Sequence, residues 1–370
     1  DLFYDHIDFY KLRKQGEIFM MGTKLALTGM ALGAAALAFQ PTAAQAEWPE
    51  RPITVVVMYG AGGGTDTVIR TLVGEMAKST GWKINVINKP GAVGGIATRY
   101  VNGKKPDGYT LLGAANYNKY ASVMGHTKTR AWKEWQYMQA ANSRGSWSVR
   151  PDSKFKTFQD IIAAAKANPG KISISTSGKG GLWHELAAVV AVSAGVTLKY
   201  VPYKGGKNAT LAGLNGETMI AGGGVHEHIE HIRAGKLRNI QQTGAADIDA
   251  GGGKMMTSVG KFLPQIQSQL PFSGIYNLAM LKTIDKSIQA KVQKAFVAAV
   301  KSDTFAKVAK KKFFEIDIRL GAQANRRAAQ VEVQTAATFE KLNIKGARSL
   351  KQLGLPTPAN FDAWWAKSGM

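Results

Sequence analysis

The segment covering residues 53–78 constrains the fold most, because a strand signal, a turn signal and a helix signal follow one another in it without a break. The β-branched run at 53–58 is typical of a strand that is covered on both faces. The glycines at 60–64 predict a tight turn, and the apolar residues at helical spacing over 65–78 predict a helix. A strand joined to a helix by a short glycine turn is the building unit of an α/β fold with a mainly parallel sheet.

The same alternation of strands and helices continues along the chain and restarts after Pro151. Further strands are expected at 83–87, 109–115, 171–176, 198–201, 218–221 and 237–242, and further helices at 155–167, 182–194, 209–214 and 225–234. After Pro271 an extended stretch precedes helices with no strand between them, and such helices pack more easily on an existing sheet than in a third domain. We therefore expect two lobes, each a mainly parallel sheet flanked by helices. Lobe one is discontinuous, with residues 47–149 and 273–370, and lobe two is the inserted segment 150–272.

Residues 1–46 are expected to be a leader and signal peptide. Lys24 precedes fifteen mostly apolar residues at 25–39, and Ala44-Gln45-Ala46 fits a cleavage site before Glu47. The apolar stretch is shorter than the ~20 residues of a transmembrane helix. The pattern predicts an exported protein.

The composition restricts the chemistry. The chain has no cysteine, which excludes disulfides, thiolate metal sites and a cysteine nucleophile. Lys and Arg number 48 against 25 Asp and Glu, so the surface favours anionic partners. Export argues against a nucleic-acid partner, and the basic run at 310–312 lacks the interleaved aromatic residues that stack on bases. A basic protein that binds polyanions in a salt-dependent way remains an alternative.

Two glycine-rich loops are candidate anion sites. The first, 58–66, lies between a strand and a helix, where free N–H groups and the helix dipole favour an anion. It lacks the Gly-Lys-Ser/Thr end of a P-loop and the dinucleotide-binding spacing, so nucleotide binding is not indicated. The alternative is a plain turn in which Thr65 or Asp66 caps the helix.

The second loop, 177–181, precedes a helix that is expected to begin at Leu182. The two helix starts are expected to face each other across a crevice at the carboxyl ends of the strands. Lys179 and His184 are candidate partners for a carboxylate there.

Catalytic signatures are weak. His184 and Glu185 resemble the start of an H-E-x-x-H motif, but position 188 is Ala, and no G-x-S-x-G motif occurs. His226, His228 and His231 have a spacing that zinc could use. We favour a polar helix face for them and expect no metal and no cofactor. The alternative is an exported, metal-assisted hydrolase that uses these histidines.

A series of ordered motifs resembles the Bug solute receptors, the TctC family of the tripartite tricarboxylate transporters. The motifs lie at 48–53, 62–66, 88–95, 106–110, 156–157, 167–171, 177–178 with His184, 201–205 and 234–237. The resemblance covers nearly everything from Trp48 to about Leu342. It implies a Venus-flytrap, type II-like periplasmic binding protein whose two lobes close on a small organic carboxylate. It further implies delivery to the large and small membrane subunits of the transporter, and binding rather than catalysis. We expect a monomer.

The resemblance places the solute between the two glycine loops, in a crevice that neighbouring turns also line. The residues that it implies for solute binding are Tyr59, Gly60, Ala61, Gly62, Gly63, Gly64, Thr65, Asp66, Asn116, Ser177, Gly178, Lys179, Gly180, Gly181, His184, Tyr203 and Lys204. Gly223 and Gly224 are added as candidate backbone donors.

Three positions depart from the family pattern. Met58 stands where Pro is usual, Gly181 where Ser is common, and Met219 where Asp often occurs. The glycines at 222–224 are expected to open the next helix, either as a third backbone donor site or as room for a larger solute. These departures bear on which solute is bound, and the sequence does not name it.

Overall fold

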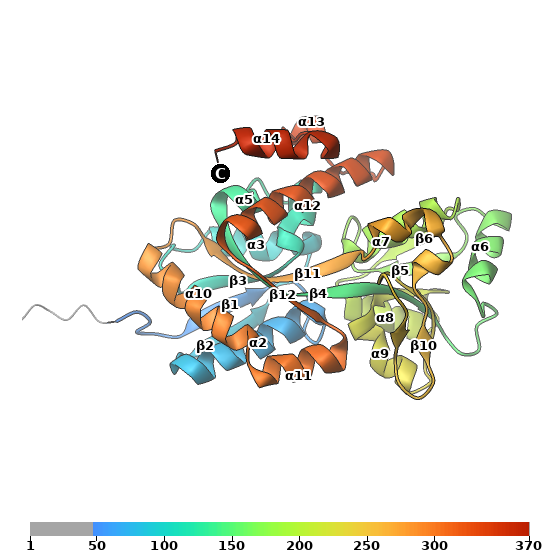
Figure 1. Cartoon of the computed structure of the whole chain (residues 1–370), viewed down its shortest axis with the longest axis horizontal. Helices are drawn as coiled ribbons and strands as arrows, with labels where there is room; N and C mark the ends of the chain where they lie inside the picture. The colour runs from blue at the N-terminus through green and yellow to red at the C-terminus, as the bar shows by residue number, and fades with distance from the viewer. Residues whose placement is uncertain (1–46, 370) are drawn as a thin grey trace, which may run out of the picture. The chain divides into compact units, whose positions relative to one another are not determined.

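The long strand β4 (Trp135–Val149) connects the two halves of the molecule. Its part at 135–144 pairs antiparallel with β11 (Ser273–Leu281), and its part at 145–149 pairs antiparallel with β7 (Ala221–Gly224) and β8 (Arg238–Gln242). We call the elements around the first part lobe one and those around the last part lobe two. Figure 1 shows β4 and β11 reaching from lobe one towards lobe two.

The computed structural model describes residues 47–369, and the account below concerns its unit from Arg51 onward. The leader and signal peptide predicted for residues 1–46 lie outside the described residues. Among residues 47–369, no helix has the length and the apolar character needed to cross a membrane.

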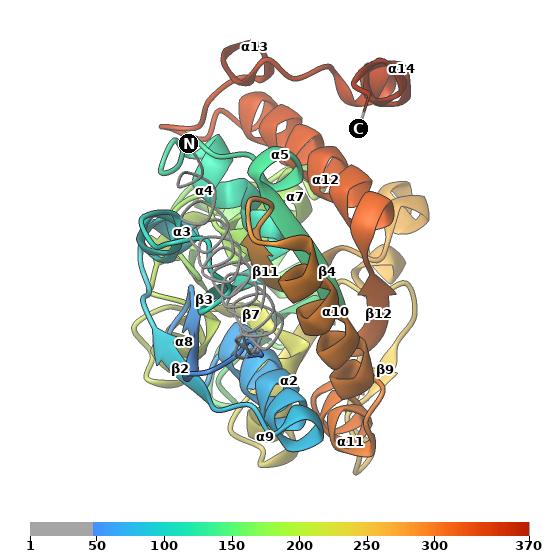
Figure 2. The same ribbon diagram turned by 90° about the vertical axis from the view of Figure 1, so that its left-hand side faces the viewer.

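Lobe one is built on a sheet with the strand order β12-β4-β11-β3-β1-β2. Its other strands are β1 (Ile53–Val57), β2 (Ile84–Asn88), β3 (Thr110–Ala115) and β12 (Glu315–Arg319). The helices are α2 (Gly64–Thr80), α3 (Gly95–Asn102), α4 (Lys119–Val123), α5 (Ala131–Glu134), α10 (Lys286–Val300), α11 (Asp303–Lys312) and α12 (Gly321–Lys341). In Figure 2, α2, α10 and α11 lie on one side of the sheet and α12 on the other. Strand β1 is part of this core, because Val55, Val56 and Val57 are fully buried.

Lobe two surrounds the last part of β4. Its parallel strands β5 (Ser173–Thr176) and β6 (Lys199–Pro202) join β7 through a bridge between Ile174 and Ile220. The helices are α6 (Phe158–Ala167), α7 (Leu182–Ser193), α8 (Gly206–Leu214) and α9 (Val225–Arg233), and a small ribbon of β9 (Ile248–Asp249) and β10 (Met255–Met256) is added. Two short helices, α13 (Leu350–Leu353) and α14 (Phe361–Lys367), follow α12 at the end of the chain.

The predicted two-lobed α/β arrangement is confirmed, with corrections. The sheets are mixed rather than mainly parallel, because β4, β11 and β12 run antiparallel to their neighbours. Strand β12 lies between helices that were expected to follow one another directly. The glycines at 222–224 belong to β7, and the last of them, Gly224, is also the N-cap residue of α9, which begins at Val225. The lobe boundaries at 149/150 and 272/273 stay a prediction.

Candidate functional site

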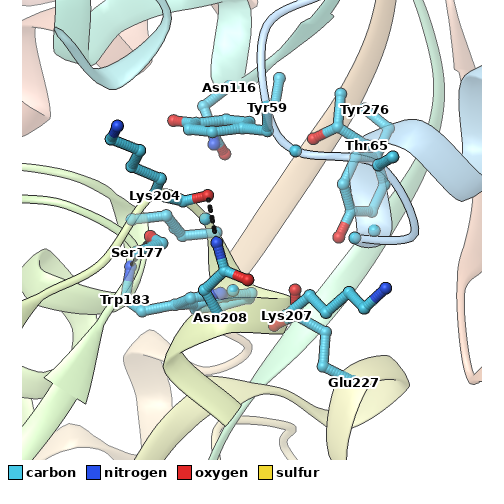
Figure 3. A pocket seen from close by; sticks show the side chains of 18 residues that line it. Tyr59, Thr65, Asn116, Ser177, Trp183, Lys204, Lys207, Asn208, Glu227 and Tyr276 are labelled. Atoms are coloured by element: carbon cyan, nitrogen blue, oxygen red, sulfur yellow. Dashed lines mark hydrogen bonds between the residues drawn. The ribbon is translucent and has the colours of Figure 1, made fainter. Parts of the chain in front are cut away.

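Three helices begin at the same pocket. Gly63, Gly181 and Gly205 are the N-cap residues of α2, α7 and α8. Because glycine has no side chain, the cap itself takes up none of the first-turn N–H groups, and these lie at the positive end of each helix dipole. The pocket, drawn in Figure 3, is open to solvent and has a cavity volume of about 50 Å³.

Residues from both lobes line this pocket. They are Tyr59, Gly60, Ala61, Gly63, Gly64, Thr65, Ala115, Asn116, Ser177, Leu182, Trp183, Lys204, Gly205, Gly206, Lys207, Asn208, Glu227 and Tyr276. Lys204 and Lys207 are exposed at this wall and carry positive charge. The hydroxyl of Tyr59 is buried and has no hydrogen-bond partner among the described residues. Burial also raises the pKa of Tyr59, so its hydroxyl keeps its proton and can donate to a solute.

Asn116 opens a strained turn at the pocket wall. Asn116, Tyr117 and Asn118 have φ values of 55°, 49° and 61°, in the left-handed region that such residues rarely adopt in succession. Strand β11 holds the turn in place: Ile275 N–H donates to Asn116 Oδ1 at 3.0 Å, and Tyr117 N–H donates to Asn277 Oδ1 at 3.1 Å. Strained backbone of this kind persists where the surrounding structure fixes it, and it gathers at functional sites.

Asp66 organises the first glycine loop and does not line the pocket. Its carboxylate accepts from Gly62 N–H at 2.8 Å, from Asn88 Nδ2 at 2.8 Å and from Arg70 Nε at 2.9 Å. Burial alone would raise the pKa of Asp66, but these hydrogen bonds and the Arg70 charge together lower it. The carboxylate therefore stays ionised and fixes the loop from behind.

His184 does the same for the second glycine loop. Its Nδ1 accepts from Gly180 N–H at 2.9 Å, and its ring packs against Tyr200 with centroids 4.6 Å apart. Burial lowers the pKa of His184 to about 4, so the imidazole is neutral at pH 7. It shapes the loop and lies outside the pocket lining.

The structure brings many of the predicted residues together. Nine line the pocket directly: Tyr59, Gly60, Ala61, Gly63, Gly64, Thr65, Asn116, Ser177 and Lys204. Three line the adjoining opening: Gly178, Lys179 and Tyr203. Outside the pocket lining are Gly62, Asp66, Gly180, Gly181, His184, Gly223 and Gly224. A role in binding stays a prediction for each of them.

Sequence reasoning missed several residues that line the pocket. They are Ala115, Leu182, Trp183, Gly206, Lys207, Asn208, Glu227 and Tyr276, whereas Gly205 belongs to the 203–205 turn that was expected at the crevice. Gly205 and Gly206 follow strand β6 and precede α8, so they carry the same strand–glycine–helix signal as the other two loops. Tyr276 had no such signal, because only the antiparallel pairing of β11 with β3 brings it to Ala115.

The three histidines of α9 have separate surroundings. His226 Nε2 lies 3.2 Å from the Tyr276 hydroxyl, and His228 Nδ1 lies 3.0 Å from the hydroxyls of Ser146 and Ser148. Burial lowers the pKa of His228 to about 3. Among residues 47–369, no group of three or more His, Cys, Asp or Glu side chains is arranged to hold a metal ion. The interpretation as a polar helix face is also wrong, because His226 and His228 are buried.

Two α/β lobes that meet at a pocket faced by helix N-termini define a two-lobed solute-binding protein. The family model described as "Tripartite tricarboxylate transporter family receptor" (TctC) matches residues 68–344. The chain belongs to this family, whose members are solute-binding receptors and not enzymes.

Individual relatives agree with this assignment. The Cupriavidus necator "UPF0065 protein in gbd 5'region" is 34% identical over 227 residues, which cover 60% of this chain and 68% of that protein. Among solved structures, the periplasmic binding protein BugD has a TM-score of 0.74 at 22% identity, covering 80% of this chain and 99% of BugD. MatC from Rhodopseudomonas palustris, solved with bound malate, has a TM-score of 0.69 at 20% identity, covering 80% of this chain and 99% of MatC. These structures show that the fold is that of periplasmic binding proteins.

Proposed function

We propose that this protein captures a small organic carboxylate in the pocket between its lobes. It acts in the periplasm and delivers the solute to the large and small membrane subunits of a tripartite tricarboxylate-type transporter. Family membership supports the receptor role. The malate bound to MatC, a protein of the same fold, is itself a carboxylate.

The observation that carries the proposal is the convergence of three glycine-capped helix starts on one pocket. Carboxylate oxygens need several donors at once, and backbone N–H groups at helix starts supply them without a side chain. Lys204 and Lys207 add positive charge to the same wall. A neutral or cationic solute without an acidic group would leave these donors unpaired, which costs binding energy.

The proposed contacts follow the placement of the residues. Residues 59–61, 63–65, Asn116, Ser177 and Lys204 bind the solute directly. The adjoining opening, through which the solute enters, is lined by Gly178, Lys179 and Tyr203. Gly62, Asp66, Gly180, Gly181 and His184 shape the two loops, and Gly223 and Gly224 support the pocket from β7.

Binding is coupled to a hinge. Both β4 and β11 pass between the lobes, so bending at these strands and near residues 149–152 and 270–275 lets the lobes part and close. Closure brings the helix starts of both lobes onto one solute.

A thermal-shift screen of the purified protein tests the proposal. The set contains mono-, di- and tricarboxylates, aromatic acids and amino acids, with calorimetry on the hits. A ligand present at 100 times its Kd stabilises the folded state by about 2.7 kcal/mol, which is readily seen as a higher Tm. Failure of every acid to raise the Tm, together with salt-sensitive binding to heparin, would instead favour the basic polyanion-binding alternative.

A further inference from the structure

Glu227 places a carboxylate in the wall of a pocket that otherwise favours anions. It lies in the first turn of α9, and its side chain is 7% exposed. A Cβ added to Gly206, the first residue of α8, would overlap the Glu227 carboxylate. The side chain therefore reaches the start of α8, and its Oε1 also lies near Gly63 of lobe one. In the view of Figure 3, Glu227 lies on a different side of the pocket from Ser177 and Lys204.

The two oxygens of Glu227 are used unequally. Oε2 accepts from Gly224 N–H at 2.9 Å, which holds the side chain in place. Oε1 lies 3.6 Å from Nε2 of His226, beyond hydrogen-bond distance. Burial would raise the pKa of Glu227, but the neighbouring His226 and the Gly224 amide together lower it. A fixed negative charge thus stands at the pocket with one oxygen open to a donor.

A buried carboxylate is stable only with partners, and a solute that enters the pocket must match it. A second acidic group placed beside Glu227 would meet like charge, while a cationic donor would form a charge-assisted hydrogen bond. From this we infer that the solute is an amino-carboxylate, whose ammonium group binds Glu227 while its carboxylate binds the helix starts near Ser177 and Lys204. The inference rests on the proposed function, because it adds a binding partner for the solute's ammonium group to the pocket that is proposed to bind its carboxylate.

Matched pairs of acids that differ by one ammonium group test the inference. Calorimetry and thermal shift compare succinate with aspartate, glutarate with glutamate, and butyrate with 4-aminobutyrate. We expect the best amino-bearing member to bind the wild-type protein about 10- to 100-fold more tightly than its partner, as a charge-assisted hydrogen bond provides. Glu227→Gln should reduce this ratio about tenfold or more and leave the affinity for the plain acid unchanged or higher.

Two controls separate recognition from folding. Gln keeps an oxygen that can accept from Gly224 N–H, so the Tm of the solute-free variant should stay close to that of the wild type. Glu230→Gln removes the same charge one turn further along α9, where Glu230 pairs with Lys312 and Arg233 at a partly exposed position. It should leave the ratio within twofold.

Each outcome bears on a different claim. The inference would be overturned if plain and amino-bearing acids bound equally tightly. It would also be overturned if Glu227→Gln left the ratio of their affinities unchanged. In both cases the proposal that the protein is a carboxylate receptor would still hold. Binding of none of these acids, nor of any acid in the wider screen, would overturn the proposed function and this inference with it.

Discussion

Replacing Gly64 by Ala is expected to weaken solute binding. Gly64 is the first residue of α2 in lobe one, and a Cβ there would come closer than 3.0 Å to Nε2 of His226 and to the hydroxyl of Tyr276. Ordinary van der Waals contact begins at 3.4 Å, so the imidazole would have to withdraw by more than about 0.4 Å. His226 belongs to lobe two and Tyr276 to β11 of lobe one, so the added methyl group strains both the contact between the lobes and the packing of α2 within lobe one.

The histidine has little freedom to turn away. Its ring packs against Trp183, Tyr276 and Phe314, with centroids 6.1, 5.9 and 4.9 Å away. Overpacking of this kind costs roughly 1–3 kcal/mol. If the cost arises only when the lobes meet around the solute, the affinity falls about 5- to 150-fold.

Calorimetry with any carboxylate that binds the wild-type protein measures this loss. Gly74→Ala is the matched control, because it lies in the same helix and a Cβ there meets nothing within 4 Å. The control should bind as the wild type does and gain up to about 1 kcal/mol in unfolding free energy. Wild-type affinity in Gly64→Ala would refute the claim that the lobes meet at this glycine when solute is bound.

Three further predictions concern residues that support the site. Glu185→Gln should lower the free energy of unfolding by roughly 3–5 kcal/mol in urea titrations, because it leaves buried Lys119, 3.1 Å away, unpaired; the double variant with Lys119→Met should recover part of the loss. Since the pKa of His184 is about 4 in the folded protein and 6.5 is its ordinary value, the unfolded chain takes up the proton first. Stability should therefore fall by about 3 kcal/mol as the pH drops from 6.5 to 4, and His184→Gln should remove that part of the slope in pH-dependent unfolding curves. Asp66→Ala should lower the free energy of unfolding by about 1–3 kcal/mol and weaken solute binding in calorimetry, because the Gly62 N–H loses its acceptor. An unchanged affinity would show that the first glycine loop does not contribute to binding.

The parts of the site that could be predicted from the sequence are those with a local signal. The apolar run of β1, the glycines after it and the helical spacing of α2 all lie within about thirty residues. The same signal recurs before α7, and the structure places Gly60 and Ser177 on one pocket, as the prediction required. Each loop has its own local signal, but β1 and β5 belong to different sheets, so the sequence signal alone does not explain why the two loops meet.

Strand β4 could not be predicted in this way. Gln139, Ser143, Ser146 and Ser148 are all buried in it, so no alternation of apolar and polar residues marks it as a strand. Their side chains are paired by residues far along the chain, such as Tyr276 for Ser143 and His228 for Ser148. Burial of such a polar strand depends on partners that a single sequence does not reveal. Glu227 was missed for a related reason, because its carboxylate lies against Gly206 at the start of α8, a separate helix.

Because glycine occupies the three helix starts, the backbone there can bind an acidic group, and other residues must select among acidic solutes. Ser, Thr, Asp or Asn at Gly63, Gly181 or Gly205 would accept a first-turn N–H group within the chain. Glycine leaves these donors to the solute and lets it approach the backbone closely. The backbone cradle therefore suits acidic groups in general, and discrimination among them falls to the side chains at its edge, above all Glu227 and Lys207. Replacing Glu227 and Lys207 by other residues should change which acid binds most tightly, while the affinity for a simple carboxylate should stay about the same.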